Sequence, residues 1–356
     1  MFEMYSQLAE RALVGEAPSQ EDALWILAGH DVELLPLLHA AFVPRRHHFG
    51  RKVSVQVLNN IQNGLCSEDC GYCAQAKGSE SGIREYRMKA DEQIFADAER
   101  AARAGASRYC MALSGRGPGH ERTRHLARLI RELKSRYPIE ICLSAGLMDD
   151  ECTRILSEAG LDRLNHNLNT SEAHYGKICS THGYGERLAT LAAAKRHGLA
   201  TCSGFILGMG ETDRDVVEVA FKLRELETPS IPVNFLIPIE GNRIADDGSL
   251  DPERCLRALC LLRFVNPAAE IRVAGGREGH LRAMQVLSLY PANSLFVGGY
   301  LTTRGDGTRE TYAMIEDAGF EIEGNPLYER EGGRGASGFR APGGAEELLR
   351  PEVAPR

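Results

Sequence analysis

Residues 107–145, SRYCMALSGRGPGHERTRHLARLIRELKSRYPIEICLSA, alternate between strand-like and helix-like sequence. Apolar residues recur every three or four positions in HERTRHLARLIRELKSR, which is the period of an amphipathic helix. The flanking segments SRYCMAL and EICLSA are short apolar runs typical of buried strands. A strand, a helix and a second strand in this order predict parallel strands joined by a crossover helix.

The same strand, loop and helix pattern repeats along most of the chain. The predicted strands are residues 53–58, 107–113, 140–145, 163–168, 200–207, 232–239, 270–275 and 294–299. Amphipathic segments lie between them, and several end at a glycine of the kind that stops a helix. Eight alternating units predict an α/β fold of the closed (β/α)8 TIM type. An open, doubly wound sheet is the alternative, because periodicity does not prove closure.

The two ends of the chain differ from this repeating region. Residues 1–40 predict a helical segment that caps the main domain, with Ser19 as an N-cap. Residues 41–322 are predicted to form the barrel. The basic stretch RRHHFGRK (residues 45–52) is expected to be a solvated connection. Residues 323–356, rich in glycine, proline and arginine, predict a disordered tail.

The composition is that of a globular protein able to bury a core. Hydrophobic residues make up 43% of the 356 residues, and the net charge is -7. An acidic chain gives no electrostatic reason to expect nucleic acid or an anionic membrane as a partner. The sequence has no apolar run of about 18 residues, so we expect a cytoplasmic protein whose ten cysteines stay reduced. Such cysteines serve in metal binding, catalysis or core packing.

The stretch CSEDCGYCAQ concentrates three of the ten cysteines. Cys66, Cys70 and Cys73 have the spacing CxxxCxxC, with no fourth cysteine beside them. Structural zinc sites have four protein ligands, and electron-transfer iron–sulfur cubes are commonly held by four cysteines. Three thiols therefore indicate a metal site with one position open to a substrate or cofactor. The alternatives are a zinc knuckle completed by His47 or His48, and a redox pair of Cys70 and Cys73.

Three predicted strands each carry a cysteine near the middle. Cys110, Cys142 and Cys202 lie at a depth similar to that of Arg272 in the seventh strand. Packing is the alternative for any one of them, because cysteine is often buried as a small apolar residue. Together with a buried arginine they favour a second site, since a buried guanidinium needs negative partners such as cluster thiolates. Core packing is predicted for Cys152, Cys179, Cys255 and Cys260.

Two further stretches carry ligand-like residues. LNHNLNTS places Asn165, Asn167 and Asn169 at alternate positions, so that three amides would project to one side of a strand. Asparagine is disfavoured in strands, which points to a polar ligand such as a urea-like or ribose group. GFILGMGE offers glycines at which a ligand can approach the backbone, with Glu211 at the strand end.

These motifs together resemble one known family. CSEDCGYC is similar to the cluster-binding motif of radical S-adenosylmethionine enzymes. Within that superfamily, the order and spacing over residues 40–322 resemble the biotin synthases, in RYCMALSGRG, EICLSAGLM, LNHNLNTSEAHYGKI, ATCSGFILGMGET, VNFLIPIEGN, IRVAGGRE and ANSLFVGGYLTT. One departure is Asn169, which stands where some members carry aspartate and so removes a charge beside the cofactor ribose.

The resemblance implies a role for each candidate residue. A 4Fe-4S cube, whose fourth iron binds S-adenosylmethionine, would be held by Cys66, Cys70 and Cys73. A 2Fe-2S cluster that donates sulfur would be held by Cys110, Cys142, Cys202 and Arg272, with Ser294 nearby. The S-adenosylmethionine pocket would be lined by Tyr72, Asn167, Asn169, Gly204, Gly208, Glu211 and Ile237. Dethiobiotin would contact Asn167, Asn234, Thr302 and Thr303.

The resemblance also implies the reaction and the partners. Reductive cleavage of S-adenosylmethionine would give a 5′-deoxyadenosyl radical that takes hydrogen from an unactivated carbon of dethiobiotin. Sulfur from the 2Fe-2S cluster would then close the ring of biotin. A reducing protein such as flavodoxin or ferredoxin would supply electrons, and a homodimer is expected. The alternatives to this radical sulfurtransferase are a different radical enzyme and a non-catalytic iron–sulfur scaffold or sensor.

Overall fold

The computed structural model of the chain describes residues 2–29 and 32–324. Within these residues ten parallel strands form one sheet, which closes because β1 pairs with both β2 and β9. The strands are β1 (Lys52–Gln62), β2 (Arg108–Leu113), β3 (Glu140–Ser144), β4 (Arg163–Asn165), β5 (Ala200–Cys202), β6 (Phe205–Leu207), β7 (Ser230–Phe235), β8 (Glu270–Val273), β9 (Ser294–Val297) and β10 (Glu321–Glu323). The predicted closed barrel is confirmed. Of the predicted tail, residues 325–356 lie outside the described residues, whereas Glu323 belongs to β10 and is not part of a disordered tail.

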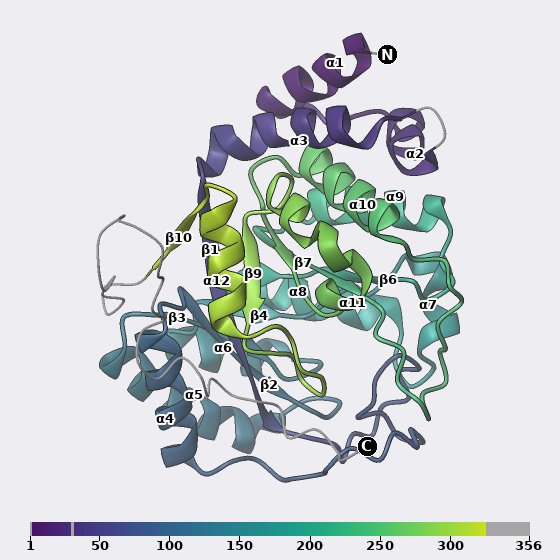
Figure 1. Ribbon diagram of the computed structural model, residues 1–356. Coiled ribbons are helices and arrows are strands. Elements are labelled where there is room, and N and C mark those ends of the chain that lie inside the picture. The colour runs from purple at the N-terminus through teal and green to yellow at the C-terminus, as the bar shows by residue number, and fades with distance from the viewer. Residues whose placement is uncertain (1, 30–31, 325–356) are drawn as a thin grey trace.

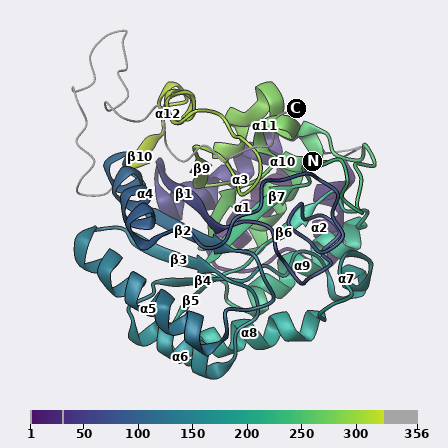
Figure 2. The same cartoon turned by 90° about the horizontal axis from the view of Figure 1, so that it is seen from below.

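Helices surround the strands, as the view along the barrel in Figure 2 shows. They are α4 (Asp91–Arg103), α5 (Gly119–Arg136), α6 (Asp150–Glu158), α7 (Glu172–Ile178), α8 (Tyr184–Arg196), α9 (Asp213–Glu225), α10 (Pro252–Val265), α11 (Arg277–Leu281), the 3-10 helix η1 (Arg282–Leu289) and α12 (Thr308–Asp317). In α5 the buried residues Leu126, Ile130 and Leu133 recur at helical spacing, so one face packs inward. Nowhere in the described part of the chain does a helix have the length and apolar character that crossing a membrane requires.

The predicted strand over residues 200–207 is divided in two. Its halves, β5 and β6, are separated by Ser203 and Gly204, and both pair with β7. A Cβ atom at Gly204 would lie 1.8 Å from the carbonyl oxygen of Pro232 in β7. The backbones therefore approach more closely here than a regular ladder allows, which interrupts the strand. The short strand β10, which pairs with the first residues of β1, was not predicted.

Three helices precede the barrel and cover its amino end, as Figure 1 shows: α1 (Phe2–Leu13), α2 (Gln20–Ala28) and α3 (Leu34–Phe49). Ser19 caps α2 as predicted, because its hydroxyl accepts the backbone N–H of Asp22 at 3.0 Å and the Asp22 carboxylate accepts that of Ser19 at 3.1 Å. The helical cap extends beyond the predicted boundary at residue 40, since α3 ends at Phe49. Helix α3 packs against α10 of the barrel.

The basic stretch after residue 44 is not simply a solvated connection, because Arg45 is completely buried. Its guanidinium donates to the backbone carbonyls of Ala292 (3.2 Å), Lys52 (2.7 Å) and Gly50, and lies 4.8 Å from the ring centre of Phe320. Burial lowers the pKa of Arg45 to about 10. Arg45 thus ties the helical cap to both ends of the barrel sequence.

Replacing Arg45 with methionine should leave three backbone carbonyls without their donor. Each unsatisfied buried acceptor costs about 1–3 kcal/mol, so we expect the free energy of unfolding to fall by about 3 kcal/mol. Arg46, which is exposed, provides the matched control, and Arg46→Met should change stability by less than about 0.5 kcal/mol. Urea unfolding followed by circular dichroism measures both values. Equal losses in the two variants would contradict this role of Arg45.

Candidate active site

One cavity of about 360 Å³ lies at the carboxyl ends of the strands and extends down into the barrel. It brings together most of the predicted site residues: Cys66, Cys70, Tyr72, Cys73, Cys110, Cys142, Asn167, Asn169, Asn234, Ile237, Arg272, Thr302 and Thr303. Four others do not line it: Cys202, Gly204, Gly208 and Glu211. Residues far apart in sequence therefore meet at one place, as a barrel with its site at the carboxyl end allows.

The three clustered cysteines occupy a compact loop that follows β1. The backbone N–H of Cys73 donates to the carbonyl of Cys70 at 3.0 Å, which folds the motif into a tight turn. Gly71 at the centre of this turn donates to Ile178 at 2.8 Å and accepts from Ile244 at 2.9 Å. A Cβ atom on Gly71 would lie 2.9 Å from the side chain of Arg243, so the loop fits between two other segments. These contacts fix the cysteines at the rim of the cavity.

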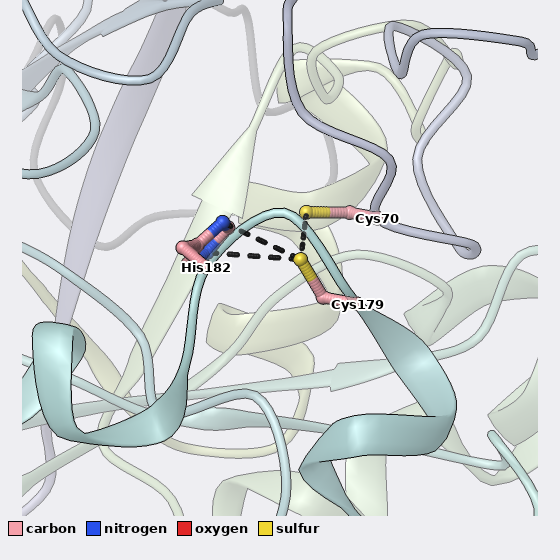
Figure 3. A group of neighbouring side chains, drawn as sticks. All are labelled: Cys70, Cys179 and His182. Carbon is pink, nitrogen blue, oxygen red and sulfur yellow. Dashed lines mark hydrogen bonds between the residues drawn. The ribbon is translucent and has the colours of Figure 1, made fainter.

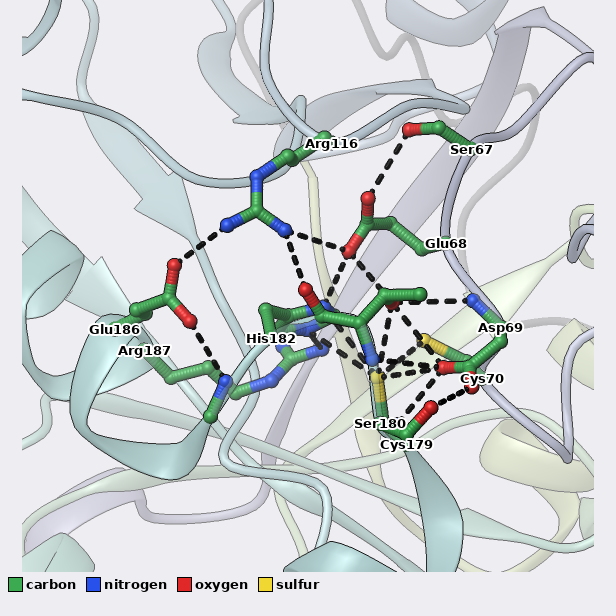
Figure 4. Close-up of polar contacts among 12 residues, drawn as sticks. Ser67, Glu68, Asp69, Cys70, Arg116, Cys179, Ser180, His182, Glu186 and Arg187 are labelled. Carbon is green, nitrogen blue, oxygen red and sulfur yellow. Dashed lines mark hydrogen bonds and ion pairs between the residues drawn. The ribbon is translucent and has the colours of Figure 1, made fainter.

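Two acidic residues of the motif anchor the loop to the segment after α7 (Figure 4). The Asp69 carboxylate accepts the backbone N–H groups of Ser180 (2.9 Å) and Thr181 (3.2 Å). Burial alone would raise the pKa of Asp69, but these bonds and that from the Ser180 hydroxyl hold it well below its ordinary value. Glu68 accepts from the Thr181 hydroxyl at 2.9 Å. The motif is therefore held by charge-assisted hydrogen bonds.

The histidine of this network is held from both sides. Glu68 lies 2.5 Å from Nδ1 of His182, and the guanidinium of Arg187 lies 2.9 Å from Nε2. Because a guanidinium can only donate, Nε2 accepts and Nδ1 carries the proton toward Glu68. Arg116 adds ion pairs to Glu68 (3.3 Å) and Glu186 (2.7 Å). These contacts could not be predicted from the sequence, since nothing in the spacing of His182, Arg187, Arg116 and Glu186 links them to the cysteines.

A further cysteine, Cys179, lies directly behind the motif. Figure 3 shows its sulfur between Cys70 and His182. The sulfur lies 3.8 Å from that of Cys70 and 3.4 Å from Nδ1 of His182. The sequence predicted only core packing for Cys179. The residue is indeed buried, but its thiol also contacts one of the motif cysteines.

The second set of cysteines lies deeper in the cavity. Cys110 and Cys142 are register partners on β2 and β3, and together with Cys202 they form one buried cluster of thiols. Asn165 donates to the sulfur of Cys202 at 3.2 Å, and Arg272 does so at 3.7 Å. The bond from Cys142 and the charge of Arg272 outweigh burial and lower the pKa of Cys202 well below its ordinary value. The arrangement favours a thiolate beside the guanidinium.

Arg272 is held by a carboxylate that the sequence analysis missed. Its guanidinium donates to Glu270 at 2.6 Å and to the Ser230 hydroxyl at 2.8 Å. The guanidinium carbon Cζ lies 5.0 Å from the ring centre of Phe296. Glu270 also accepts two bonds from Arg108, at 3.0 and 2.9 Å. Burial would raise the pKa of Glu270, but the two arginines lower it strongly. Since Glu270 precedes Arg272 by two residues, strand alternation could have revealed it.

Asparagine side chains line the wall between the two sets of cysteines. Strand β4 ends at Asn165, so simple strand alternation does not extend to Asn167 and Asn169. All three nevertheless reach the cavity, and Asn169 does so with a left-handed backbone (φ 71°). Asn169 donates to the hydroxyl of Tyr72 at 2.7 Å. Asn234 accepts the backbone N–H of Gly275 at 3.0 Å, which fixes the orientation of its amide.

The remaining predicted cofactor residues have structural contacts of their own. Glu211 accepts the backbone N–H groups of Gly208 and Met209, both at 2.7 Å. A Cβ atom on Gly208 would lie 2.5 Å from the side chain of Leu250, and Gly204 is constrained by β7 as described above. These residues shape the backbone beside the cavity, and direct contact with a cofactor stays a prediction for them.

The donor chemistry of both sets fits iron–sulfur clusters. All ten cysteines are free thiols, and thiolate is the ligand that iron–sulfur clusters prefer. Nε of Arg272 is buried without a hydrogen-bond partner among the described residues. The Nε–H group of Arg272 is therefore available to a group bound beside the deeper cysteines.

Two family models match the chain in succession. The Radical SAM superfamily covers residues 61–223, and the Biotin and Thiamin Synthesis associated domain covers residues 232–321. Both lie within the one barrel, and their boundary falls just before Pro232 of β7.

The chain also resembles methylornithine synthase (TM-score 0.76, 21% identity, 88% of this chain and 97% of that one). A FeFe-hydrogenase maturase from Carboxydothermus hydrogenoformans has a TM-score of 0.76 at 18% identity, over 90% and 79% of the two chains. At these identities the likenesses show the fold alone.

A barrel of this type with three thiols in a loop at its rim is the structure of a radical S-adenosylmethionine enzyme. Sequence relatives identify the family within this class of enzymes. A biotin synthase from Magnetococcus marinus is 55% identical over 89% of this chain and 98% of its own length. One from Acaryochloris marina is 57% identical over 86% and 88%. The chain therefore belongs to the biotin synthase family.

Replacing Glu270 with glutamine should remove the charge that Arg108 and Arg272 share. Breaking one side of a buried ion pair costs about 3–5 kcal/mol, because a charge is left buried and uncompensated. We expect a loss of that size in the free energy of unfolding of the cluster-free chain. Glu225→Gln, which breaks an exposed ion pair to Lys222, should cost less than about 1 kcal/mol. Equal losses in the free energy of unfolding of the two variants would contradict the proposed role of Glu270.

Proposed function

We propose that this chain converts dethiobiotin to biotin by radical insertion of sulfur, with the two sets of cysteines holding two different clusters. The observation that carries the proposal is their placement at two depths of one cavity. Cys66, Cys70 and Cys73 lie at its rim, while Cys110 and Cys142 line its deeper wall beside Arg272. A substrate between them would touch the products of one site and the sulfur of the other.

The rim residues would hold a 4Fe-4S cluster and S-adenosylmethionine, and the deeper residues Cys110, Cys142, Cys202 and Arg272 a 2Fe-2S cluster. When bound, these groups supply the electron, the carbon radical and the sulfur that the reaction needs. The chain supplies their ligands and the charge that balances them. Arg272 places a fixed positive charge beside Cys202, and Glu270 keeps that guanidinium in position.

The residues proposed to bind S-adenosylmethionine are Tyr72, Asn167, Asn169, Gly204, Gly208, Glu211 and Ile237. Asn169 is a neutral amide held by the Tyr72 hydroxyl, so it would recognise a ribose by hydrogen bonding rather than by charge. The glycines and Glu211 set the path of the backbone beside the cavity. Their contribution is then to bring main-chain groups within reach of the cofactor.

The proposed substrate contacts are Asn167, Asn234, Thr302 and Thr303. Asn167 accepts the backbone N–H of Gly204 at 3.1 Å, and Asn234 accepts that of Gly275. Each amide is therefore fixed in one orientation. Asn234 already donates one N–H to the carbonyl of Phe205 at 3.3 Å, so its second N–H and the NH₂ group of Asn167 would be available to a ureido oxygen. The two threonines lie beyond β9 at the cavity mouth, where a longer substrate tail would end. The apolar side chains of Leu58 and Phe296, which pack with the deeper cysteines, would exclude water from a reactive carbon.

We also propose a reductant, a compartment and an oligomeric state for the enzyme. A reducing protein such as flavodoxin or ferredoxin would deliver the electrons. The enzyme would act in the cytoplasm, where its ten thiols stay reduced. It would do so as a homodimer, on the expectation from the family.

Anaerobic reconstitution with iron and sulfide, followed by assays for 5′-deoxyadenosine and biotin, tests the function. We expect both products from S-adenosylmethionine, a reductant and dethiobiotin. Absence of 5′-deoxyadenosine with dethiobiotin present would refute the enzyme and favour an iron–sulfur scaffold. Formation of 5′-deoxyadenosine without biotin would point to another substrate.

Two cysteine variants should separate the clusters. Cys142→Ser should lose the 2Fe-2S absorbance and biotin formation but keep the cube and cleavage of S-adenosylmethionine. Cys73→Ser should lose cleavage itself. Because each change removes a proposed ligand, the loss in the affected step should exceed the roughly 100-fold loss caused by removing an outer-shell group. Cys255→Ala, in buried helix α10, is the control and should keep both products. Full biotin formation by Cys142→Ser would contradict the assignment.

A further inference from the structure

Cys179 presents a thiol to one cysteine of the rim motif. The two sulfurs of Cys70 and Cys179 are 3.8 Å apart, and the residues are 9% and 2% exposed (Figure 3). The two thiols come from different elements, since Cys70 lies in the loop after β1 and Cys179 ends α7. The proposed reaction uses no sulfur at position 179.

The backbone holds this pair of sulfurs together. Gly71 donates its N–H to the carbonyl of Ile178 at 2.8 Å, and Asp69 accepts the N–H of Ser180 at 2.9 Å. Residues on both sides of Cys70 are thus bonded to residues on both sides of Cys179. A disulfide requires a sulfur separation of about 2.05 Å, so each sulfur would move by roughly 1 Å. Side-chain rotation within a fixed pair of backbones supplies such a movement.

We propose that Cys70 and Cys179 are a thiol–disulfide site of the chain before a cluster is inserted, with hydrogen peroxide as the oxidant. Peroxide oxidises the Cys70 sulfur, which faces the cavity, to a sulfenic acid and releases one water. The Cys179 thiol attacks that sulfur, the S–O bond breaks, and a second water leaves as the disulfide forms. Two thiols and one peroxide thus give one disulfide and two waters. Part of its significance rests on the proposed function, in which Cys70 is a cluster ligand.

The disulfide would protect a ligand that oxidation otherwise destroys. A sulfenic acid without a neighbouring thiol proceeds to sulfinic and sulfonic acids, and these steps are irreversible for most proteins. A disulfide instead returns to two thiols when two electrons arrive from a small dithiol. While it persists, Cys70 cannot bind iron. The pair therefore both protects the rim motif and delays cluster assembly until reducing conditions return.

Cys73 is the competing partner for Cys70, because the two form a CxxC sequence. In the structure they share a turn in which Cys73 donates its N–H to the carbonyl of Cys70. The sulfur within hydrogen-bond distance of Cys70 in the described part of the chain is that of Cys179. The geometry therefore favours the long-range pair over the local one.

Mass spectrometry of the full-length, cluster-free chain tests the pairing directly. The reduced protein is treated with one equivalent of hydrogen peroxide, alkylated and digested without reductant. We expect a cross-linked peptide that joins Cys70 to Cys179, which is absent from Cys179→Ala and retained in Cys152→Ala, a control at another buried cysteine. A cross-link between Cys70 and Cys73, or oxidised Cys70 without any cross-link, would overturn the proposal.

Cluster uptake provides the second measurement. After several equivalents of hydrogen peroxide, enough to carry an unprotected sulfenic acid to a sulfinic acid, and then dithiothreitol, wild type should take up as much iron and sulfide as untreated protein. Cys179→Ala treated in the same way should take up less, by about twofold or more, because its Cys70 has been oxidised irreversibly. Equal recovery by the two proteins would contradict protection. Failure of the untreated wild type to take up any cube would instead contradict the proposed cluster site, and the cross-link would still decide the pairing.

Discussion

The ion-pair network of Arg108, Glu270 and Arg272 supports the deeper half of the barrel interior. All three side chains project inward, and Glu270 bonds to both guanidiniums at 2.6 to 3.0 Å. Removing such charges from water costs several kcal/mol each, so the network is stable only when every charge has its partner. That requirement fixes the guanidinium of Arg272, and with it the positive charge that Cys202 faces. The sulfur-donating site proposed here depends on a carboxylate that binds no metal itself.

The rim of the cavity has a separate support. Asp69 and Glu68 join the three-cysteine loop to the segment after α7, with His182 and Arg187 behind them (Figure 4). Each half of the cavity thus has its own charged framework, one built on strands and one on loops. The cysteines of one half are then held in place independently of the other. This division would allow one barrel to carry the two chemically different sites proposed here.

The fold was largely predictable, because strand and helix periods alternate without interruption and the cysteine spacing is local. The split between β5 and β6 was not, since it depends on how closely β7 approaches Gly204. Partners such as His182 and Cys179 lie more than a hundred positions from the motif that they contact, and no pattern in the sequence connects them. Glu270 was within reach of the same alternation that identified Arg272. The residue types could be read from the sequence, but the long-range contacts between them could not.

In the function proposed here, the deeper cysteines and Arg272 hold the sulfur that enters the product. Anaerobic protein whose cluster sulfide carries an isotopic label tests it, when a single turnover is run with unlabelled S-adenosylmethionine and dethiobiotin. Mass spectrometry of the biotin formed gives the answer. We expect the biotin to carry the label. Biotin that forms in that turnover without the label would contradict it.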